Sequence, residues 1–339
     1  MGLSFLTVCR QLAPNPLGPG MRCRKKKMSE QKGYHPRFTG IPTLMRFPWA
    51  ESFEGLDVAL VGVPFDLGVT HRAGARHGPR QVRDFSSMVR KTNHVTMVSP
   101  RELCTIADVG DVPVDIFSIE RSLAIIEGFY GELHRAGAMP LSVGGDHLIT
   151  LPILRGITRH RSVGLVHFDA HCDTEGAYMG NPYHHGTPFW HATLEGLIDP
   201  KRTVQIGIRG SLSDPDQWAF SQEAGMRVIG IEEYFDLGYR GVIAEIRRVV
   251  GEGPVYVSFD VDGLDPIYAP GTGTPEAGGF NMFEALSMVR ALRGLEVIGA
   301  DVVEVSPPFD PTGLTAMHAA TILFELLCIM VEPWARKGR

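Results

Sequence analysis

From about residue 56 onward, short segments that are almost entirely apolar alternate with longer segments of helical periodicity. Strands in which nearly every residue is hydrophobic are buried on both faces, as in a parallel sheet that helices cover. The repeated order of strand and helix predicts a single α/β domain, with three α/β/α layers around an eight-stranded, mostly parallel sheet. The expected strands span residues 58–63, 105–109, 140–143, 163–168, 204–208, 227–231, 255–259 and 297–303, and the expected helices span residues 79–89, 119–136, 148–158, 239–250, 282–295 and 315–331.

The composition narrows the classes of protein that the chain can belong to. Its 339 residues, of which 44% are apolar, are enough to bury a sizeable core. A net charge of −5 gives no sign of a nucleic-acid-binding surface, and no apolar run approaches the roughly 18–20 residues that a membrane span requires. The five cysteines show no Cys-x-x-Cys spacing, which argues against a disulfide framework or a thiolate zinc site and favours a reducing, cytoplasmic location.

The N-terminal segment differs from the rest of the chain. Residues 1–27 carry several Arg and Lys residues, no acidic residue, and prolines at Pro14, Pro16 and Pro19. We assign residues 1–35 to a basic, disordered extension and residues 36–339 to the folded domain. A mitochondrial presequence is the alternative, although the prolines oppose the amphipathic helix that such a presequence forms. A further alternative is an upstream start, with Met28 as the native initiator.

Potential metal ligands follow the apolar segments at alternating positions. Asp169, His171 and Asp173 follow one segment, and Asp260 and Asp262 end another. In an extended chain, residues two apart point to the same face, so each set can converge on one point. Sites in open α/β sheets lie beyond the carboxyl ends of the strands, and Asp169 and Asp260 fall at those ends, as does His147.

A third apolar segment ends close to His147, which brings the set to four aspartates and two histidines. Taken singly, an Asp after a strand is usually a turn former or helix cap, and a lone His is more often structural than a ligand. Taken together, four carboxylates would repel one another unless cations neutralise them. The pattern therefore predicts two divalent ions that share carboxylates and activate a water molecule.

Six motifs in this chain resemble those of the ureohydrolases, the family of arginase, agmatinase and their relatives. The resemblance extends from about residue 36 to the C-terminus, and the agmatinase-type branch, which includes guanidinobutyrase and guanidinopropionase, is closer than arginase. The matching motifs are Gly144-Gly-Asp-His147, His167-Phe-Asp-Ala-His-Cys-Asp173, His185-Gly-Thr-Pro-Phe189, Ser258-Phe-Asp-Val-Asp-Gly-Leu-Asp-Pro266, Gly271-Thr-Gly-Thr-Pro-Glu276 and Glu304-Val-Ser-Pro-Pro308.

The resemblance implies an arginase-like fold and a binuclear-metal amidinohydrolase that converts a guanidino compound to urea and an amine. A hydroxide bridging the ions would attack the guanidinium carbon. Mn²⁺ is the expected metal, and Ni²⁺ is an alternative that Asp and His ligands also suit. By the same resemblance, one ion would be held by His147, Asp169, Asp173 and Asp260, and the other by His171, Asp169, Asp260 and Asp262.

Catalytic and substrate-binding roles also follow from the resemblance. Asp173 would hydrogen-bond the hydroxide, His185 would carry a proton to the leaving amine, and Glu304 would bind the guanidinium group through paired hydrogen bonds. Tyr178 and Glu276 are expected to contact the substrate. His167 and Cys172 are expected to pack structurally, whereas Asp146 and Asp265 are expected to fix loops.

The chain departs from the family in segments that would surround the substrate. His71-Arg-Ala-Gly74 stands where relatives commonly carry Asn-Arg-Pro-Gly, and Leu314 replaces a common Asn ahead of His318. The loop of residues 174–184 carries Tyr178 but no Lys or Arg, and Glu175 offers a negative charge for an amine tail. These features raise the alternative of a substituted guanidine or a biguanide such as metformin, hydrolysed with nickel.

Two further classes remain open. One is a non-catalytic subunit that binds guanidines or stabilises a partner, and the other is a deacetylase-like hydrolase with one zinc ion. The presence of all six ligand residues and His185 argues against the first, and the Asp173 and Asp262 ligands argue against the second. The family resemblance implies a homotrimer or homohexamer, with a hetero-oligomer containing a paralogue as an alternative.

Overall fold

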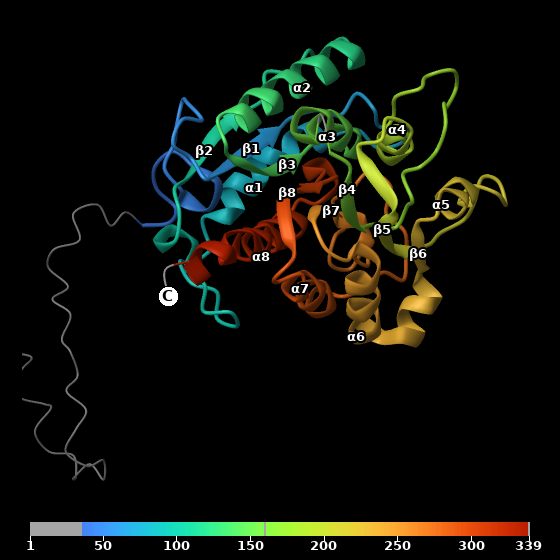
Figure 1. The fold of residues 1–339 in the computed structure, drawn as a ribbon. Helices are drawn as coiled ribbons and strands as arrows, with labels where there is room; N and C mark the ends of the chain where they lie inside the picture. The colour runs from blue at the N-terminus through green and yellow to red at the C-terminus, as the bar shows by residue number, and fades with distance from the viewer. Residues whose placement is uncertain (1–35, 159–160, 338–339) are drawn as a thin grey trace, which may run out of the picture. The chain divides into compact units, whose positions relative to one another are not determined.

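The computed structural model describes residues 36–158 and 161–337. An eight-stranded sheet forms the centre of the domain, and every pair of neighbouring strands is parallel. The strand order is β2-β1-β3-β8-β7-β4-β5-β6 (Figure 1). The strands are β1 (Val58–Val63), β2 (Ile106–Asp111), β3 (Met139–Gly144), β4 (Val163–Phe168), β5 (Ile198–Ile208), β6 (Arg227–Gly230), β7 (Pro254–Asp260) and β8 (Glu296–Val303).

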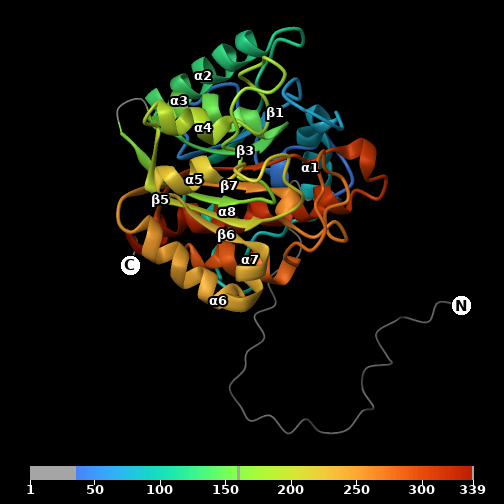
Figure 2. The same cartoon turned by 90° about the vertical axis from the view of Figure 1, so that its right-hand side faces the viewer.

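Helices cover both faces of this sheet, and Figures 1 and 2 show α2, α3 and α4 on one side, with α6 and α7 on the other. The two buried clusters agree with this division, because one contains residues of α2, α3 and α4 and the other contains residues of α1, α6, α7 and α8. The helices are α1 (Gly78–Ser86), α2 (Ile119–Arg135), α3 (Thr150–Thr158), α4 (Pro188–Leu194), α5 (Ala219–Ala224), α6 (Ile231–Val250), α7 (Met282–Ala291) and α8 (Leu314–Lys337).

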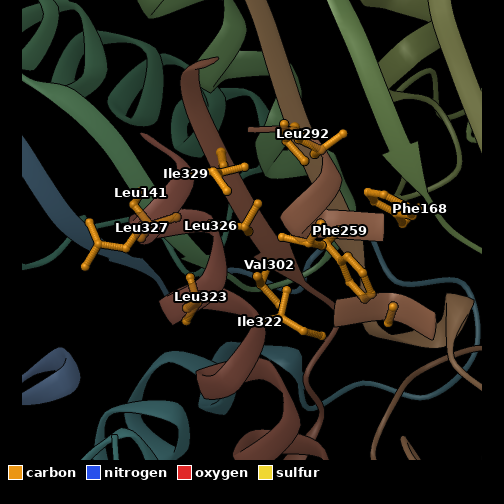
Figure 3. Close-up of a cluster of buried hydrophobic side chains, with 14 of the residues drawn as sticks. Leu141, Phe168, Phe259, Leu292, Val302, Ile322, Leu323, Leu326, Leu327 and Ile329 are labelled. Carbon is orange, nitrogen blue, oxygen red and sulfur yellow. The ribbon is translucent and has the colours of Figure 1, made fainter. Parts of the chain in front are cut away.

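The strands bury side chains on both of their faces. In β1, Val58 and Leu60 belong to one cluster, whereas Ala59 and Val61 belong to the other. This alternation follows from the two-residue period of a strand, and it explains why the segment is apolar throughout. Figure 3 shows part of the cluster that contains residues of α1, α6, α7 and α8, in which side chains of α8 and Leu292, just after α7, lie against those of the central strands. Each fully buried aliphatic or aromatic side chain of this kind contributes roughly 1.5–3 kcal/mol.

One helix meets the length and hydropathy expected of a membrane span. The segment Leu314–Pro333 of α8 has a mean hydropathy of 1.9, and 72% of its most apolar window is buried inside the protein. The expectation that no segment of the chain is long and apolar enough is therefore wrong. Burial accounts for the composition, because a central core helix needs apolar residues around most of its circumference.

The predicted elements are mostly confirmed, with differences at segments that contain Pro or Gly. The sheet is entirely parallel rather than mostly parallel, and β5 begins six residues earlier than expected, at Ile198. Helices α4 and α5 were not predicted, because both are short and α4 begins with Pro188. Helix α6 starts at Ile231 rather than at residue 239, since Gly238 interrupts it with a φ of 62° and gives the sequence the pattern of a break.

The strand order places four chain segments at one edge of the sheet. Strands β3, β8, β7 and β4 are consecutive neighbours in the sheet, although β3 and β8 lie far apart in the sequence, as do β7 and β4. Their carboxyl ends therefore bring together residues that lie more than 150 positions apart in the sequence, as at the binding crevices of other open α/β sheets. The assignment of residues 1–35 to an extension lies outside the described residues.

Candidate active site

The segment after β4 turns sharply instead of continuing as a strand. β4 ends at Phe168, and Asp173 has a φ of 52°, a conformation that costs a residue with a side chain roughly 1–3 kcal/mol. The extended geometry expected for Asp169, His171 and Asp173 is therefore wrong. The turn sends Asp169 and Asp173 toward His147, whereas His171 reaches Asp262.

His147 lies at the centre of the more deeply buried half of the site, among three aspartates. It follows β3, and its side chain is 0% exposed. Its Nδ1 atom lies 3.1 Å from Asp169 Oδ2, 2.9 Å from Asp173 Oδ2 and 3.2 Å from Asp260 Oδ2. The structure thus brings together the four residues expected around one ion. Within the described part of the chain, Nδ1 nevertheless has no hydrogen-bond partner.

A chain of hydrogen bonds explains why Nδ1 is left without a partner. The hydroxyl of Ser258 donates to Asp301 Oδ1 at 2.6 Å, so it can only accept from His147 Nε2, which lies 2.8 Å away. In the neutral ring the proton is therefore on Nε2, and the lone pair of Nδ1 points at three carboxylate oxygens. Such a buried arrangement is repulsive unless a cation or a proton lies among these atoms. Although burial opposes protonation, the three carboxylates accordingly raise the pKa of His147 well above its ordinary value. The site therefore fits a divalent metal ion.

The second half of the site is more open. His171 Nδ1 lies 3.1 Å from Asp262 Oδ2 and 3.4 Å from Asp169 Oδ1, and the His171 side chain is 31% exposed. Asp169, His171 and Asp262 form a group that could hold a metal ion. Asp260 contributes Oδ2 to the His147 side, while its Oδ1 accepts the backbone N–H of Asp262. Asp169 therefore faces both halves, whereas Asp260 directs Oδ2 at the buried half and Oδ1 at the backbone of Asp262 in the open half.

The carboxylates perturb one another in the directions that crowding predicts. Burial, and then the charges of Asp262 and Asp169, raise the pKa of Asp260 well above its ordinary value. Burial and the Asp169 charge likewise raise the pKa of Asp262 to about 6. Although burial opposes ionisation of Asp169, the neighbouring histidines hold its pKa well below the ordinary value. The carboxylates thus repel one another, as expected for a site that binds cations.

His167 contacts the candidate metal ligand Asp169 directly, so its role goes beyond the structural packing expected for it. Its Nε2 lies 2.7 Å from Asp169 Oδ2, and Gln205 Nε2 lies 3.2 Å from its Nδ1. The same Gln205 amide donates to the backbone carbonyl of Cys172 at 2.5 Å. The alternation of a strand could have revealed this contact, because His167 and Asp169 are two residues apart. Cys172 is buried as expected, but it also lines the cavity described below.

His185 and Glu304, which come from different segments of the chain, contact each other beside the cluster of carboxylates. His185 Nδ1 lies 3.0 Å from Glu304 Oε1, which also accepts the backbone N–H of His147 at 2.9 Å. Burial lowers the pKa of His185, but the Glu304 carboxylate outweighs it and raises the pKa to about 9. Glu304 itself has a φ of 63°, and its Oε2 is buried without a hydrogen-bond partner among the described residues.

A cavity of about 260 Å³ opens beside these groups. Of the three expected substrate-binding residues, Tyr178 and Glu276 line it, together with His171, Asp173 and His185. Glu304 is not among the lining residues, and it lies behind the cavity wall in contact with His185. The other lining residues include some that sequence reasoning missed, namely Thr70, Arg209, Gln217 and Trp218. No periodic pattern marks these four residues, because they lie in loops whose course depends on tertiary packing.

Arg209, which gives the cavity wall its positive charge, holds two neighbouring loops together. Arg209 donates from all three guanidinium nitrogens to backbone carbonyls, among them those of Asp262, Gly263 and Glu276. Its N–H groups are therefore occupied by the loop that carries Glu276 and by the turn after β7. The positive charge of Arg209 still acts on the cavity, where Glu175 and Glu276 contribute carboxylates.

Of the segments in which this chain departs from the family pattern, the loop of residues 174–184 reaches the cavity, whereas Leu314 and His318 do not. Tyr178 and Asn181 exchange backbone hydrogen bonds in a tight turn whose tip, Met179, is 90% exposed. Leu314 begins α8, where His318 Nδ1 contacts the Tyr268 carbonyl at 2.7 Å, and neither residue is among those that line the cavity. The expectation that Leu314 and His318 lie at the mouth of the site is therefore wrong.

Comparison with known proteins agrees with this geometry. Residues 56–328 match the model of the arginase family. The chain belongs to the arginase family. The guanidinopropionase of Pseudomonas aeruginosa is 59% identical over 304 residues, which cover 89% of this chain and 96% of the relative. The human mitochondrial guanidino acid hydrolase is 43% identical over 319 residues, covering 92% of this chain and 91% of the relative.

The fold comparison places the chain in the same family. The proclavaminate amidino hydrolase of Streptomyces clavuligerus superimposes with a TM-score of 0.85 at 39% identity, covering 88% of this chain and 99% of that chain. The predicted arginase-like fold and the resemblance to the agmatinase-type branch are thus confirmed. These arginase-family relatives are hydrolases that act on guanidino C–N bonds, so membership supports an enzyme and offers no support for a single-zinc deacetylase.

Proposed function

We propose that this protein is a two-metal hydrolase that cleaves a short guanidino acid, with 3-guanidinopropionate as the first candidate, to urea and an amino acid. The observation that carries the proposal is the Nδ1 atom of His147, which is buried without a hydrogen-bond partner among three carboxylates. The name of the relative that shares 59% identity supports the choice of a guanidino acid, and so does that of the guanidinobutyrase that shares 46%.

The histidine and aspartate side chains at the site could hold two metal ions, one in the buried half and one in the open half. His147, Asp169, Asp173 and Asp260 would hold one ion, and His171, Asp262, Asp169 and Asp260 would hold the other. Oxygen and imidazole donors without thiolates favour Mn²⁺, and Ni²⁺ is the alternative to be tested. When bound, such ions lower the pKa of water and so supply a hydroxide near neutral pH.

Glu304 is placed to hold the guanidinium group. Its Oε1 already accepts two hydrogen bonds, whereas its Oε2 is buried and free of partners within the described residues. A buried carboxylate oxygen without a partner costs free energy, which a substrate N–H group would recover on binding. Gly273 lies next to this atom, where a side chain would have met Oε2 at 3.3 Å.

His185 is placed to manage protons. Hydrolysis of a guanidinium ion breaks the C–N bond to the substrate tail and forms a C–O bond from water, and the departing nitrogen gains the two protons that the water loses. His185 lines the cavity and is held by Glu304, whose charge favours the protonated ring. We therefore assign to His185 the transfer of a proton to the leaving amine, and to Asp173 a hydrogen bond to the attacking water.

The cavity walls carry charges of both signs, which bear on the charge of the substrate tail. Arg209 favours an anionic tail, whereas Glu175 and Glu276 favour a cationic one such as that of agmatine. The Glu175 carboxylate already accepts a hydrogen bond from the Gln217 amide, which reduces its capacity for an ammonium group. Together with the names of the relatives, this contact favours the guanidino acid. Tyr178, which is 53% exposed, would lie over the tail from the rim.

Urea release tests the proposal directly. Metal-stripped protein is reconstituted separately with Mn²⁺ and Ni²⁺ and assayed on 3-guanidinopropionate, 4-guanidinobutyrate, agmatine and metformin, with Glu304→Gln as the active-site control. We expect the highest kcat/KM on 3-guanidinopropionate with Mn²⁺, and a loss of at least about 100-fold in the variant. Activity confined to metformin with Ni²⁺ would instead support the biguanide alternative. Guanidine binding without urea from any compound would support a non-catalytic subunit.

We also propose that the active form is a homo-oligomer in the cytoplasm. The resemblance to ureohydrolases supports a trimer or hexamer, and the free Cys104, Cys172 and Cys328 suit a reducing compartment. Light scattering of the purified protein, alone and after co-expression with a candidate paralogue, would distinguish a homo-oligomer from a hetero-oligomer. Imaging of the chain with and without residues 1–27 would test the presequence alternative.

A further inference from the structure

Thr70 is the side chain that faces His185 from the opposite side to Glu304. It lies in the loop between β1 and α1, and its Oγ1 is 2.7 Å from His185 Nε2. The Thr70 N–H lies 3.4 Å from the same nitrogen. The backbone ties the two segments together, because His185 N–H donates to the Gly68 carbonyl at 2.9 Å. Thr70 and His185 both line the cavity.

The two contacts of the ring define which nitrogen carries the proton in neutral His185. Glu304 Oε1 also accepts the His147 N–H, and as a carboxylate oxygen it can only accept, so His185 Nδ1 must donate to it. In the neutral ring, Nε2 therefore has a lone pair that accepts from Thr70. The direction of the Thr70 backbone N–H, which points at the same nitrogen, agrees with an acceptor at Nε2.

We propose that Thr70 is a positioning residue for proton transfer by His185, a role that rests on the proposed function. A hydroxyl is both a donor and an acceptor, so it remains bonded to Nε2 whether the ring is neutral or protonated. When the ring gains a proton that the attacking water has lost, Nε2–H donates to Thr70 Oγ1 or to the departing nitrogen. Transfer to that nitrogen forms its N–H bond as the C–N bond breaks, and the ring returns to the neutral form.

A structural role alone predicts different behaviour. If Thr70 only held its loop against His185, its methyl group and backbone would matter more than its hydroxyl. Thr70→Val keeps the shape and removes the hydroxyl, whereas Thr70→Ser keeps the hydroxyl and removes the methyl group. The pair of variants therefore separates the two roles, and thermal unfolding of each variant checks that the fold is retained.

Steady-state kinetics across a pH series provide the first test, with the metal-loaded enzyme and its best substrate. We expect Thr70→Val to lower kcat about tenfold, the equivalent of one hydrogen bond, with KM within about twofold of wild type and an altered pH profile. Thr70→Ser should stay within about twofold of wild type. An unchanged Thr70→Val enzyme, or equal losses in both variants, would overturn the assignment.

Histidine ¹⁵N NMR provides a test that does not depend on activity. In protein loaded with Zn²⁺, which is diamagnetic, the Nε2 signal of His185 is assigned by its disappearance in His185→Asn. We expect it to move toward the position of a free acceptor nitrogen in Thr70→Val and to stay in Thr70→Ser. A signal that does not move in Thr70→Val contradicts the proposal. An inactive wild type would overturn the proposed function and the proton-transfer role together, whereas an active wild type with an unchanged Thr70→Val overturns only the role of Thr70.

Discussion

The two histidine ligands of the candidate metal centre occupy very different surroundings. His147 is wholly buried, faces three carboxylates and is held at its other nitrogen by Ser258. His171 is 31% exposed and faces two carboxylates. Buried ligands that are fixed by hydrogen bonds are already positioned for an ion, whereas an exposed ligand must be ordered on binding. The same residue types therefore imply one tight and one weaker metal position.

The largest effect is expected at the residue that joins the two halves. Asp169 directs Oδ2 at His147 and Oδ1 at His171, so Asp169→Asn removes charge from both positions. We expect metal content to fall from two ions per chain to none after dialysis, with complete loss of urea release. Elemental analysis measures this, with Asp236→Asn, an exposed carboxylate on α6, as the control. Retention of one ion would show that Asp169 serves only one half.

Replacing each histidine separately tests whether the halves are unequal. His171→Asn should lose the weaker ion and keep the tight one, because His147 and the three carboxylates around its Nδ1 remain. His147→Asn should weaken the tight position by roughly 100-fold or more, since it removes the buried donor. Calorimetric titration of metal-stripped protein with Mn²⁺ resolves the two steps. Identical titration curves for the two variants would refute the distinction.

A smaller effect is expected behind His147, at Asp301. This buried carboxylate accepts hydrogen bonds from Ser258, Tyr256 and Thr150, and through Ser258 it sets the tautomer of His147. Asp301→Asn should weaken the tight ion by roughly 10- to 100-fold and leave the weaker ion unchanged. Tyr256→Phe removes one hydroxyl from the other oxygen of Asp301 and serves as the control for packing. An equal loss in both variants would assign the effect to packing alone.

Sequence patterns predicted the strands and the residues at their ends, but not the contacts that these residues make with neighbouring loops and strands. The apolar segments predicted the strands, and the strands placed Asp169 and Asp260 at one edge, since parallel strands share a direction. The contacts of Thr70, Gln205 and Asp301 could not be predicted, because they depend on how loops and neighbouring strands pack. The error about Leu314 has the same origin, since a sequence difference does not show whether a residue faces the cavity.

The smallest effect concerns the response of the open half to pH. Burial and the Asp169 charge raise the pKa of Asp262 to about 6, and a metal ion binds only the deprotonated carboxylate. Because the pKa is raised, affinity is fully present above pH 7 and falls as the pH drops through 6. Between pH 7.5 and pH 5.5 the deprotonated fraction of Asp262 falls roughly fourfold, and His171, whose pKa the carboxylates also raise against the opposing effect of burial, adds to the loss. Calorimetric titration at the two pH values should therefore show at least a fourfold weaker second step, and a second step that does not change with pH would mean that Asp262 is not a ligand.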